Sequence, residues 1–148
     1  HQSIILQIIF ELNMWSDDCV TLVPLEWLKP HEEIKEKARD KLLQMTEKWG
    51  GFTKPLIVDK NTGSLLDGHH RFSVAKIMNL TSVPAICVDY LLDENIIVET
   101  WPNSNILSIS KNDVLEMCLS SSLYPAKTSR HILSYDVPPI FIPLEDLK

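Results

Sequence analysis

Strand-like and helix-like patterns alternate along the chain between residues 19 and 90. Val20–Leu25 and Val83–Val88 are apolar runs of strand length. Between them, the stretch from Glu32 to Trp49 has an apolar side chain every three or four residues, the period of an amphipathic helix, and Gly50-Gly51 supplies a left-handed end. The apolar face of this helix is expected to consist of Ile34, Ala38, Leu42, Met45 and Trp49. This alternation predicts one compact α/β unit.

The middle of the chain predicts a hairpin followed directly by a helix. Pro55–Val58 and Ser64–Leu66 are short apolar runs on either side of a polar turn. Asp67-Gly68 then ends the second strand, and apolar residues with helical spacing continue to about Leu80. These signals predict an abrupt strand–turn–helix junction.

The last third of the chain is expected to add one strand, one helix and a tail. Ile96–Thr100 has a strand pattern, and Ser110 is a good N-cap for a helix that reaches Ser120, with an acid at the third helical position. Tyr124–Arg130 is expected to be a polar loop. The proline-punctuated stretch Val137–Leu144 can add one edge strand at most.

Residues 1–18 are expected to form an N-terminal extension or edge element, and residues 19–148 the domain itself. Residue 1 is His rather than Met, so this end carries little weight. Ile4–Phe10 is apolar but far shorter than the roughly 20 residues of a membrane-spanning helix, so it is interpreted as a buried strand or short helix. The residues assigned to packing are Trp15, Trp27 and Trp49.

Composition narrows the class of partner. With 20 acidic and 14 basic side chains, the chain has a formal net charge of −6, which disfavours nucleic acid as a partner. The chain has three cysteines, Cys19, Cys87 and Cys118, and their odd number and wide spacing fit neither a disulfide framework nor a zinc site. They are interpreted as small buried side chains. A reducing, cytoplasmic location and no membrane partner are expected.

The strongest local signal is the run Asp67-Gly68-His69-His70-Arg71 at the strand–turn–helix junction. The first N–H groups of a helix have no partner within it, Gly68 lets a ligand approach the backbone, and Arg71 adds a planar cation, so the run favours a phosphate site. The alternative is an ordinary turn in which Asp67 caps the helix and both histidines are solvated.

The segment Leu65–Phe72, which carries this run, resembles the signature of the free-serine-kinase branch of the ParB/sulfiredoxin superfamily. Further stretches resemble the same branch in the same order: Leu28–Glu32, Lys54-Pro55, Val88–Tyr90, Thr100-Trp101 and Pro125–His131. The resemblance covers about residues 20–147. It implies a compact ParB/sulfiredoxin-like α/β domain with a mixed sheet and flanking helices. It also implies transfer of a phosphoryl group from ADP or ATP, with Mg²⁺, to free L-serine.

The resemblance also implies roles for individual residues. Glu32 would be the catalytic base, and Asp67 would orient the substrate hydroxyl or hold the magnesium ion. The nucleotide phosphates would be bound by Gly68, His69, His70 and Arg71. The serine would be bound by Trp101, Lys127, Thr128, Ser129 and His131. We therefore expect the turn at residues 67–71 to lie at the mouth of a cleft, with Glu32 and residues 127–131 facing it.

Each role has a structural alternative. Glu32 and Glu33 could simply favour the positive end of their helix. Residues 127–131 could be a solvated basic loop, and Trp101 a core or edge aromatic.

Two features depart from the branch. Archaeal members carry a long insertion between the segments that correspond to Trp101 and Ser110, and this chain lacks it, which puts substrate closure by that lobe in question. Ser129 stands where a second threonine is usual.

Three other functions compete with a kinase. A sulfiredoxin-like reductase needs a cysteine in the phosphate-binding turn, which here has His69-His70. A ParB-like DNA-associated nucleotide switch would be expected to have a basic face and a helix-turn-helix domain. A non-catalytic sensor of serine or nucleotide stays open because of the missing insertion.

Overall fold

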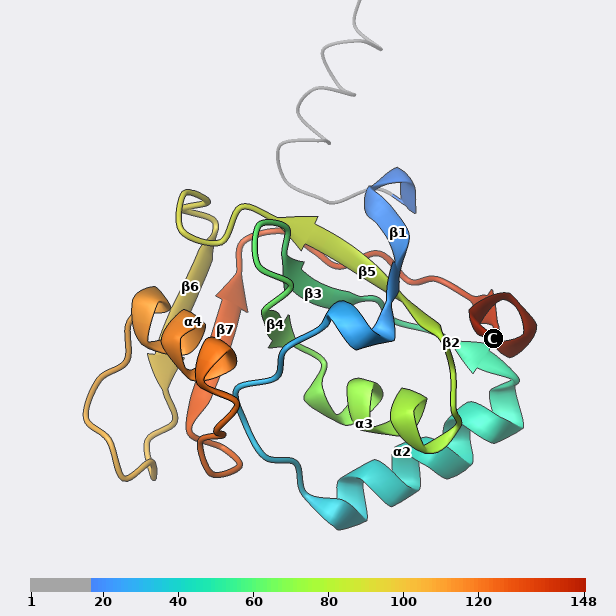
Figure 1. The fold of residues 1–148 in the computed structure, drawn as a ribbon, viewed down its shortest axis with the longest axis horizontal. Helices are drawn as coiled ribbons and strands as arrows, with labels where there is room; N and C mark the ends of the chain where they lie inside the picture. Colours follow the sequence, from blue (N-terminus) through green and yellow to red (C-terminus); the bar gives the residue numbers. More distant parts are fainter. Residues whose placement is uncertain (1–16) are drawn as a thin grey trace, which may run out of the picture.

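The computed structural model describes residues 17–148, whose centre is a mixed four-stranded sheet (Figure 1). Its strand order is β1 (Val20–Pro24), β5 (Ser82–Val88), β3 (Leu56–Asp59) and β4 (Leu65–Asp67). β3 and β5 run parallel, whereas the outer pairs β1–β5 and β3–β4 are antiparallel. The predicted α/β fold with a mixed sheet is confirmed.

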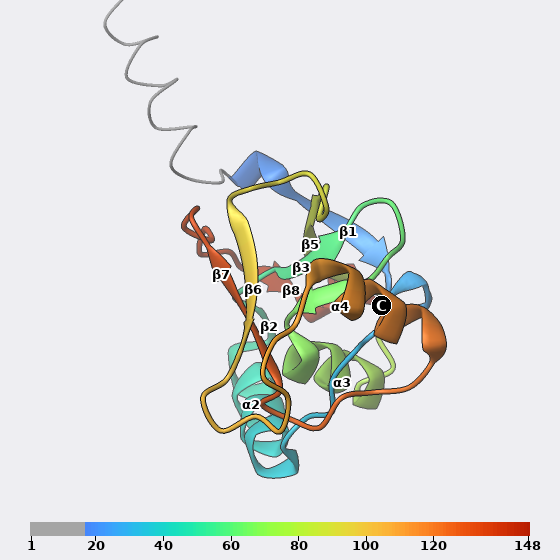
Figure 2. The same ribbon diagram turned by 90° about the vertical axis from the view of Figure 1, so that its left-hand side faces the viewer.

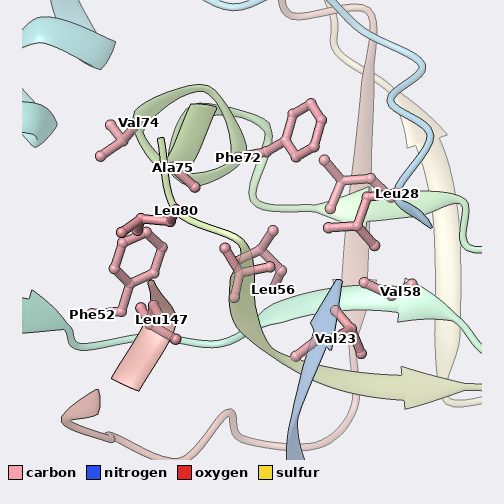
Figure 3. Packing of buried hydrophobic residues seen from close by; sticks show 13 residues of the cluster. Val23, Leu28, Phe52, Leu56, Val58, Phe72, Val74, Ala75, Leu80 and Leu147 are labelled. Atoms are coloured by element: carbon pink, nitrogen blue, oxygen red, sulfur yellow. The ribbon is translucent and has the colours of Figure 1, made fainter. Parts of the chain in front are cut away.

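Both faces of the sheet are covered. On one face, α3 (His69–Ile77) packs against α2 (Glu36–Trp49), and its buried residues Phe72, Val74 and Ala75 join Leu56 and Val58 of β3 in one core (Figure 3). The next residue of β3, Ile57, belongs to a second core on the other face, because successive side chains of a strand point in opposite directions.

The second core lies under a two-stranded ribbon and a helix. β6 (Ile96–Thr100) pairs antiparallel with β7 (Ser129–Leu133), and α4 (Lys111–Ser120) lies beside them (Figure 2). Ile96 of β6 and Val114 and Cys118 of α4 are buried in this core. The remaining elements are small: η1 (Asp17–Cys19), η2 (Leu25–Trp27), β2 (Gly51–Phe52), β8 (Ile142–Pro143) and η3 (Leu144–Leu147).

Several local predictions are confirmed. β3 and β4 form the expected hairpin, and α3 begins directly after the Asp67-Gly68 turn. α4 begins with a capping box in which Ser110 and Asp113 bond each other's backbone N–H groups. The C-terminal tail adds a single short strand, β8, which pairs with β2.

The predicted start of the first long helix is wrong. α2 begins at Glu36, not at Glu32, and ends at Gly50 in the left-handed conformation as expected. The preceding segment is extended, because Glu32 forms a β-bridge with Tyr124. Glu32 and Glu33 therefore do not lie in the first turn of a helix, which removes the helix-dipole interpretation of both.

The predicted buried face of α2 is also partly wrong. Leu42 and Leu43 pack against the core and Thr46 is buried, whereas Met45 is 37% and Trp49 43% exposed. Trp27 packs as predicted. Both Trp15 and Ile4–Phe10 lie outside the described residues.

Two strands were missed: β2, where only the glycine end of a helix was expected, and β7. Ser129 and Arg130, expected at the end of a loop, open β7. Of the cysteines, Cys118 is buried and Cys87 partly buried as predicted, but Cys19 is exposed. Within residues 17–148, none of the helices has the length and apolar character needed to span a bilayer.

Candidate active site

A cavity of about 380 Å³ opens where β4 passes into α3. Its floor is the turn at residues 67–71, and its walls come from the extended segment before α2 and from the start of β7. It brings together ten of the predicted site residues: Glu32, Asp67, Gly68, His69, His70, Arg71, Trp101, Lys127, Ser129 and His131. The eleventh, Thr128, lines an adjoining cavity of about 350 Å³ that shares Trp101 and Lys127 with the first.

The turn presents backbone to this cavity. Gly68 has φ +107°, and a Cβ atom there would lie 2.9 Å from Cγ of Leu56, so both the conformation and the space require glycine. In the described part of the chain, no side chain caps the start of α3 at His69. Its first N–H groups are therefore available to an anion at the positive end of the helix.

Arg71 lies in the first turn of α3, with part of its guanidinium unpaired among the described residues. Its Nη2 atom is 3.4 Å from the Pro55 carbonyl and 3.6 Å from Oδ2 of Asp67. Its Nε atom is buried and has no hydrogen-bond partner among the described residues. Burial lowers the pKa of Arg71, and the Asp67 carboxylate opposes that shift. The Arg71 side chain is 22% exposed and lines the cavity, so its accessible part offers a cation to an anion bound there.

Glu32 is held from one side by β7. Its Oε1 atom accepts hydrogen bonds from the backbone N–H of Ser129 at 2.8 Å and from the Ser129 hydroxyl at 2.9 Å. Burial nevertheless raises the pKa of Glu32, because the loss of hydration outweighs the hydrogen bonds from residues 127–129. A carboxylate with a raised pKa is a better proton acceptor than an exposed one.

The two histidines of the turn accept hydrogen bonds from the backbone of the segment that carries Glu32. Nε2 of His69 accepts the backbone N–H of His31, and Nε2 of His70 accepts that of Lys35, both at 3.1 Å. Burial is the first cause that lowers the pKa of both rings, so they are neutral near pH 7. Neither ring therefore offers a positive charge to a phosphate, and each fixes the segment that carries Glu32 against α3.

Cationic side chains gather around Trp101, which lines both cavities. The Lys127 ammonium and the Arg130 guanidinium each lie 4.8 Å from the Trp101 ring centroid, a cation–π distance. Arg130 also pairs with Glu99. Lys127 is exposed and has no such carboxylate partner among the ion pairs of residues 17–148.

Comparison with known proteins places this chain in a family. No protein-family model matches the chain. The chain is 36% identical over 94 residues to an ATP-dependent L-serine kinase of Staphylothermus marinus, covering 61% of this chain but only 37% of that protein. It is 31% identical over 74 residues to the ParB-like nuclease domain-containing protein YnaK of Escherichia coli, covering 48% of this chain and 84% of YnaK.

The chain belongs to the ParB-like family. Among solved structures, a mutant free serine kinase in complex with ADP superimposes with a TM-score of 0.79 at 16% identity, covering 87% of this chain and 94% of that one. The fold of this ParB-like chain is therefore that of the free serine kinases, and the predicted resemblance to that branch is confirmed.

Two buried polar side chains beside the ParB-like site have no role in the sequence interpretation. His31 is 1% exposed, and its ring lies 4.5 Å from that of His69 and 5.9 Å from that of His131. Tyr90 is fully buried, and its hydroxyl is 2.8 Å from Nε2 of His131. Only the position of His31, directly before the predicted base, could have pointed to it.

Two predicted substrate residues are largely occupied within the protein. The Thr128 hydroxyl donates to the Pro125 carbonyl at 2.6 Å. The His131 ring bonds both Tyr90 and the Leu66 backbone, and burial lowers its pKa to about 3, so it is neutral. Residues 128 and 129 are buried, which rules out a solvated loop there and leaves Lys127 as the exposed cation of the segment.

Proposed function

We propose that this ParB-like chain transfers the terminal phosphoryl group of ADP or ATP to the hydroxyl of free L-serine. The observation that carries the proposal is that Glu32, with its raised pKa, and the anion-binding start of α3 line one cavity. The names of the relatives support the choice of substrates, although the chain spans little more than a third of the Staphylothermus protein.

The nucleotide phosphates would lie at the start of α3. Gly68 and the first helical N–H groups would bind phosphate oxygens, and Arg71, which lines the same cavity, would add positive charge. Asp67 has a side chain that is 56% exposed at the same place, and its carboxylate is a hard oxygen ligand suited to Mg²⁺. A bound Mg²⁺ ion would neutralise charge on the phosphates.

Glu32 would act on the serine hydroxyl. The hydroxyl proton passes to the Glu32 carboxylate as the serine oxygen forms a bond to the terminal phosphorus. The bond from that phosphorus to the bridging oxygen breaks, and its electron pair stays on the nucleotide that leaves. His69 and His70 would keep Glu32 at a fixed position relative to the phosphates.

The serine carboxylate would lie at the Trp101 end of the cavity. Lys127 is the side chain best placed to pair with it, because it is exposed and charged. Thr128, Ser129 and His131 would shape this wall from behind, since their polar groups already bond within the protein. A cytoplasmic location is proposed with this function, because ADP and ATP are supplied there.

Incubation of the protein with L-serine, Mg²⁺ and either ADP or ATP tests the proposal. Mass spectrometry should detect O-phosphoserine with at least one nucleotide, and omission of serine should abolish the signal. Failure to form O-phosphoserine with either nucleotide would refute the kinase.

A non-catalytic sensor is the second candidate, because this chain lacks the long insertion between Trp101 and Ser110 that the resemblance to the kinase branch leads one to expect. The same experiment separates the two functions if binding is measured alongside turnover. Binding of both serine and nucleotide without any O-phosphoserine would favour the sensor.

A further inference from the structure

The hydroxyl of Ser129 lies between two side chains, each of which can accept a hydrogen bond from it. Its Oγ atom is 2.9 Å from Oε1 of Glu32 and 3.1 Å from Nε2 of His31. Ser129 is 7% exposed and His31 1% exposed, so water has little access to this contact. A serine hydroxyl has one proton and can donate to only one of the two acceptors at a time.

The His31 ring is fixed in one tautomer. Its Nδ1 atom lies 2.8 Å from the Leu65 carbonyl oxygen, which can only accept, so Nδ1 carries the hydrogen. Burial lowers the pKa of His31 to about 4, so the ring is neutral near pH 7 and Nε2 has a free lone pair. Nε2 therefore faces Ser129 as an acceptor.

The protonation state of Glu32 determines whether the Ser129 hydroxyl donates its hydrogen bond to Glu32 or to His31. An ionised carboxylate attracts the hydroxyl proton more strongly than a neutral imidazole, and His31 is then left as a buried acceptor without a donor. A protonated Glu32 is a much weaker acceptor. The hydroxyl then gains by rotating toward Nε2 of His31.

We propose that the Ser129 hydroxyl is a hydrogen-bond switch that follows the protonation state of Glu32, with His31 as its second acceptor. The proposal rests on the proposed function of Glu32 as the base. When Glu32 receives the proton of the substrate hydroxyl, the Ser129 proton stays on its own oxygen and only changes acceptor. Ser129 and His31 are thus positioning residues that stabilise the protonated base.

The backbone keeps Glu32 in place while the hydroxyl turns. The N–H of Ser129 also donates to Oε1 of Glu32, at 2.8 Å, and this bond does not depend on the side chain. Replacement of Ser129 by Ala should therefore remove the switch and leave the carboxylate positioned, whereas Thr keeps a hydroxyl.

The titratable and charged groups that face the switch come from several elements. His69 of α3 and His131 of β7 face His31, and the pKa of each lies below the ordinary value because of burial. Across the cavity, the lining side chains that carry or can carry charge are Glu33, Lys35, Asp67, His70, Arg71, Lys127 and Arg130. The pKa of Glu32 is raised, whereas that of His31 is about 4, so Glu32 is protonated first as the pH falls.

The test is a double-mutant cycle on the pH profile of kcat/KM, whose acid limb reports the base of the free enzyme. His31→Phe removes the second acceptor, so the acid limb should move to lower pH by about half to one unit, the worth of one hydrogen bond. In a Ser129→Ala background, His31→Phe should not move the limb further, because the connecting hydroxyl is missing. Ser129→Thr should keep the wild-type profile. Equal shifts in both backgrounds would overturn the proposal.

A second measurement needs neither turnover nor a change at His31. In the ¹⁵N NMR spectrum, the chemical shift of His31 Nε2 should move toward the value of a hydrogen-bonded nitrogen as Glu32 becomes protonated. This change should occur at pH values above the pKa of His31. In Ser129→Ala, the resonance should stay constant over that range. An unresponsive Nε2 in the wild type would refute the switch even in an active kinase, whereas a wild type that makes no O-phosphoserine would refute the proposed function instead.

Discussion

The backbone N–H of Ser129 donates a 2.8 Å hydrogen bond to Oε1 of Glu32, although 97 residues separate the two along the chain. Ser129 is the first residue of β7, and Glu32 lies in the extended segment before α2, which is also bridged to Tyr124. Glu32, the proposed catalytic base, is therefore held by the C-terminal part of the domain. The cavity forms only when the segment before α2 and β7 are folded together.

Gly68 offers the first prediction. Gly68→Ala should cost about 1–3 kcal/mol in the free energy of unfolding, because φ is +107° and the new Cβ would lie 2.9 Å from Leu56. Gly50→Ala is a matched control with φ +77°, where the new Cβ would lie within 4 Å of no described residue other than its chain neighbours. Urea unfolding measures stability, and calorimetry measures ADP binding. ADP binding should weaken in Gly68→Ala but not in Gly50→Ala. An equal loss of ADP affinity in both variants would contradict a special role for Gly68.

The strand–turn–helix junction was predictable because its signals are local. Asp67-Gly68 breaks a strand wherever it occurs, and a helix that opens after it presents N–H groups regardless of the rest of the fold. The capping box of Ser110 and Asp113 is equally local. The family resemblance then connected the distant segments, which composition and periodicity alone could not do.

The start of α2 and the existence of β7 depend on distant partners. The N–H groups of His31 and Lys35 bond to histidines 38 and 35 residues away, and this holds the preceding segment extended despite its helical pattern. β7 exists because it pairs with β6, about 30 residues earlier. Apolar residues occur on more than one side of α2, so periodicity alone could not decide that Leu43 turns inward and Trp49 outward.

His70 offers a prediction on positioning. His70→Ala removes the acceptor for the Lys35 N–H, so kcat should fall by about tenfold, the worth of one hydrogen bond, while ADP affinity changes little. His70→Gln can restore an acceptor at similar reach and should recover most of the activity. If His70 instead binds phosphate directly, ADP affinity will fall in His70→Ala, and Gln will not restore it.

Lys127 offers a prediction on the substrate. Lys127→Met keeps most of the length of the side chain and removes its charge, so the KM for serine should rise about 10- to 100-fold, the range of a hydrogen bond to a charged group. Nucleotide affinity should be unchanged. Lys48→Met, on the exposed side of α2, is the control. Wild-type enzyme that phosphorylates serine amide as well as serine would contradict binding of the carboxylate.

His31 predicts how stability depends on pH. Its pKa is about 4 in the folded protein and near 6.5 in the unfolded chain, so the unfolded state binds more protons between these values. Stability should therefore fall as the pH falls from 6.5 to 4, with His31 contributing up to about 1.4 kcal/mol per pH unit. Glu32 opposes this trend where it titrates, because its pKa is raised. Urea unfolding at several pH values should give a flatter slope for His31→Phe; an unchanged slope would contradict a buried, neutral His31.

The most direct measurement compares O-phosphoserine formation by wild type, Glu32→Gln and Glu47→Gln. Gln at position 32 can still accept both hydrogen bonds from Ser129 but cannot take a proton, so kcat should fall about 10²- to 10⁴-fold with little change in nucleotide binding. Glu47 lies exposed on α2, and its replacement should have no effect. Wild-type activity in Glu32→Gln would contradict Glu32 as the base and would direct the search to Asp67.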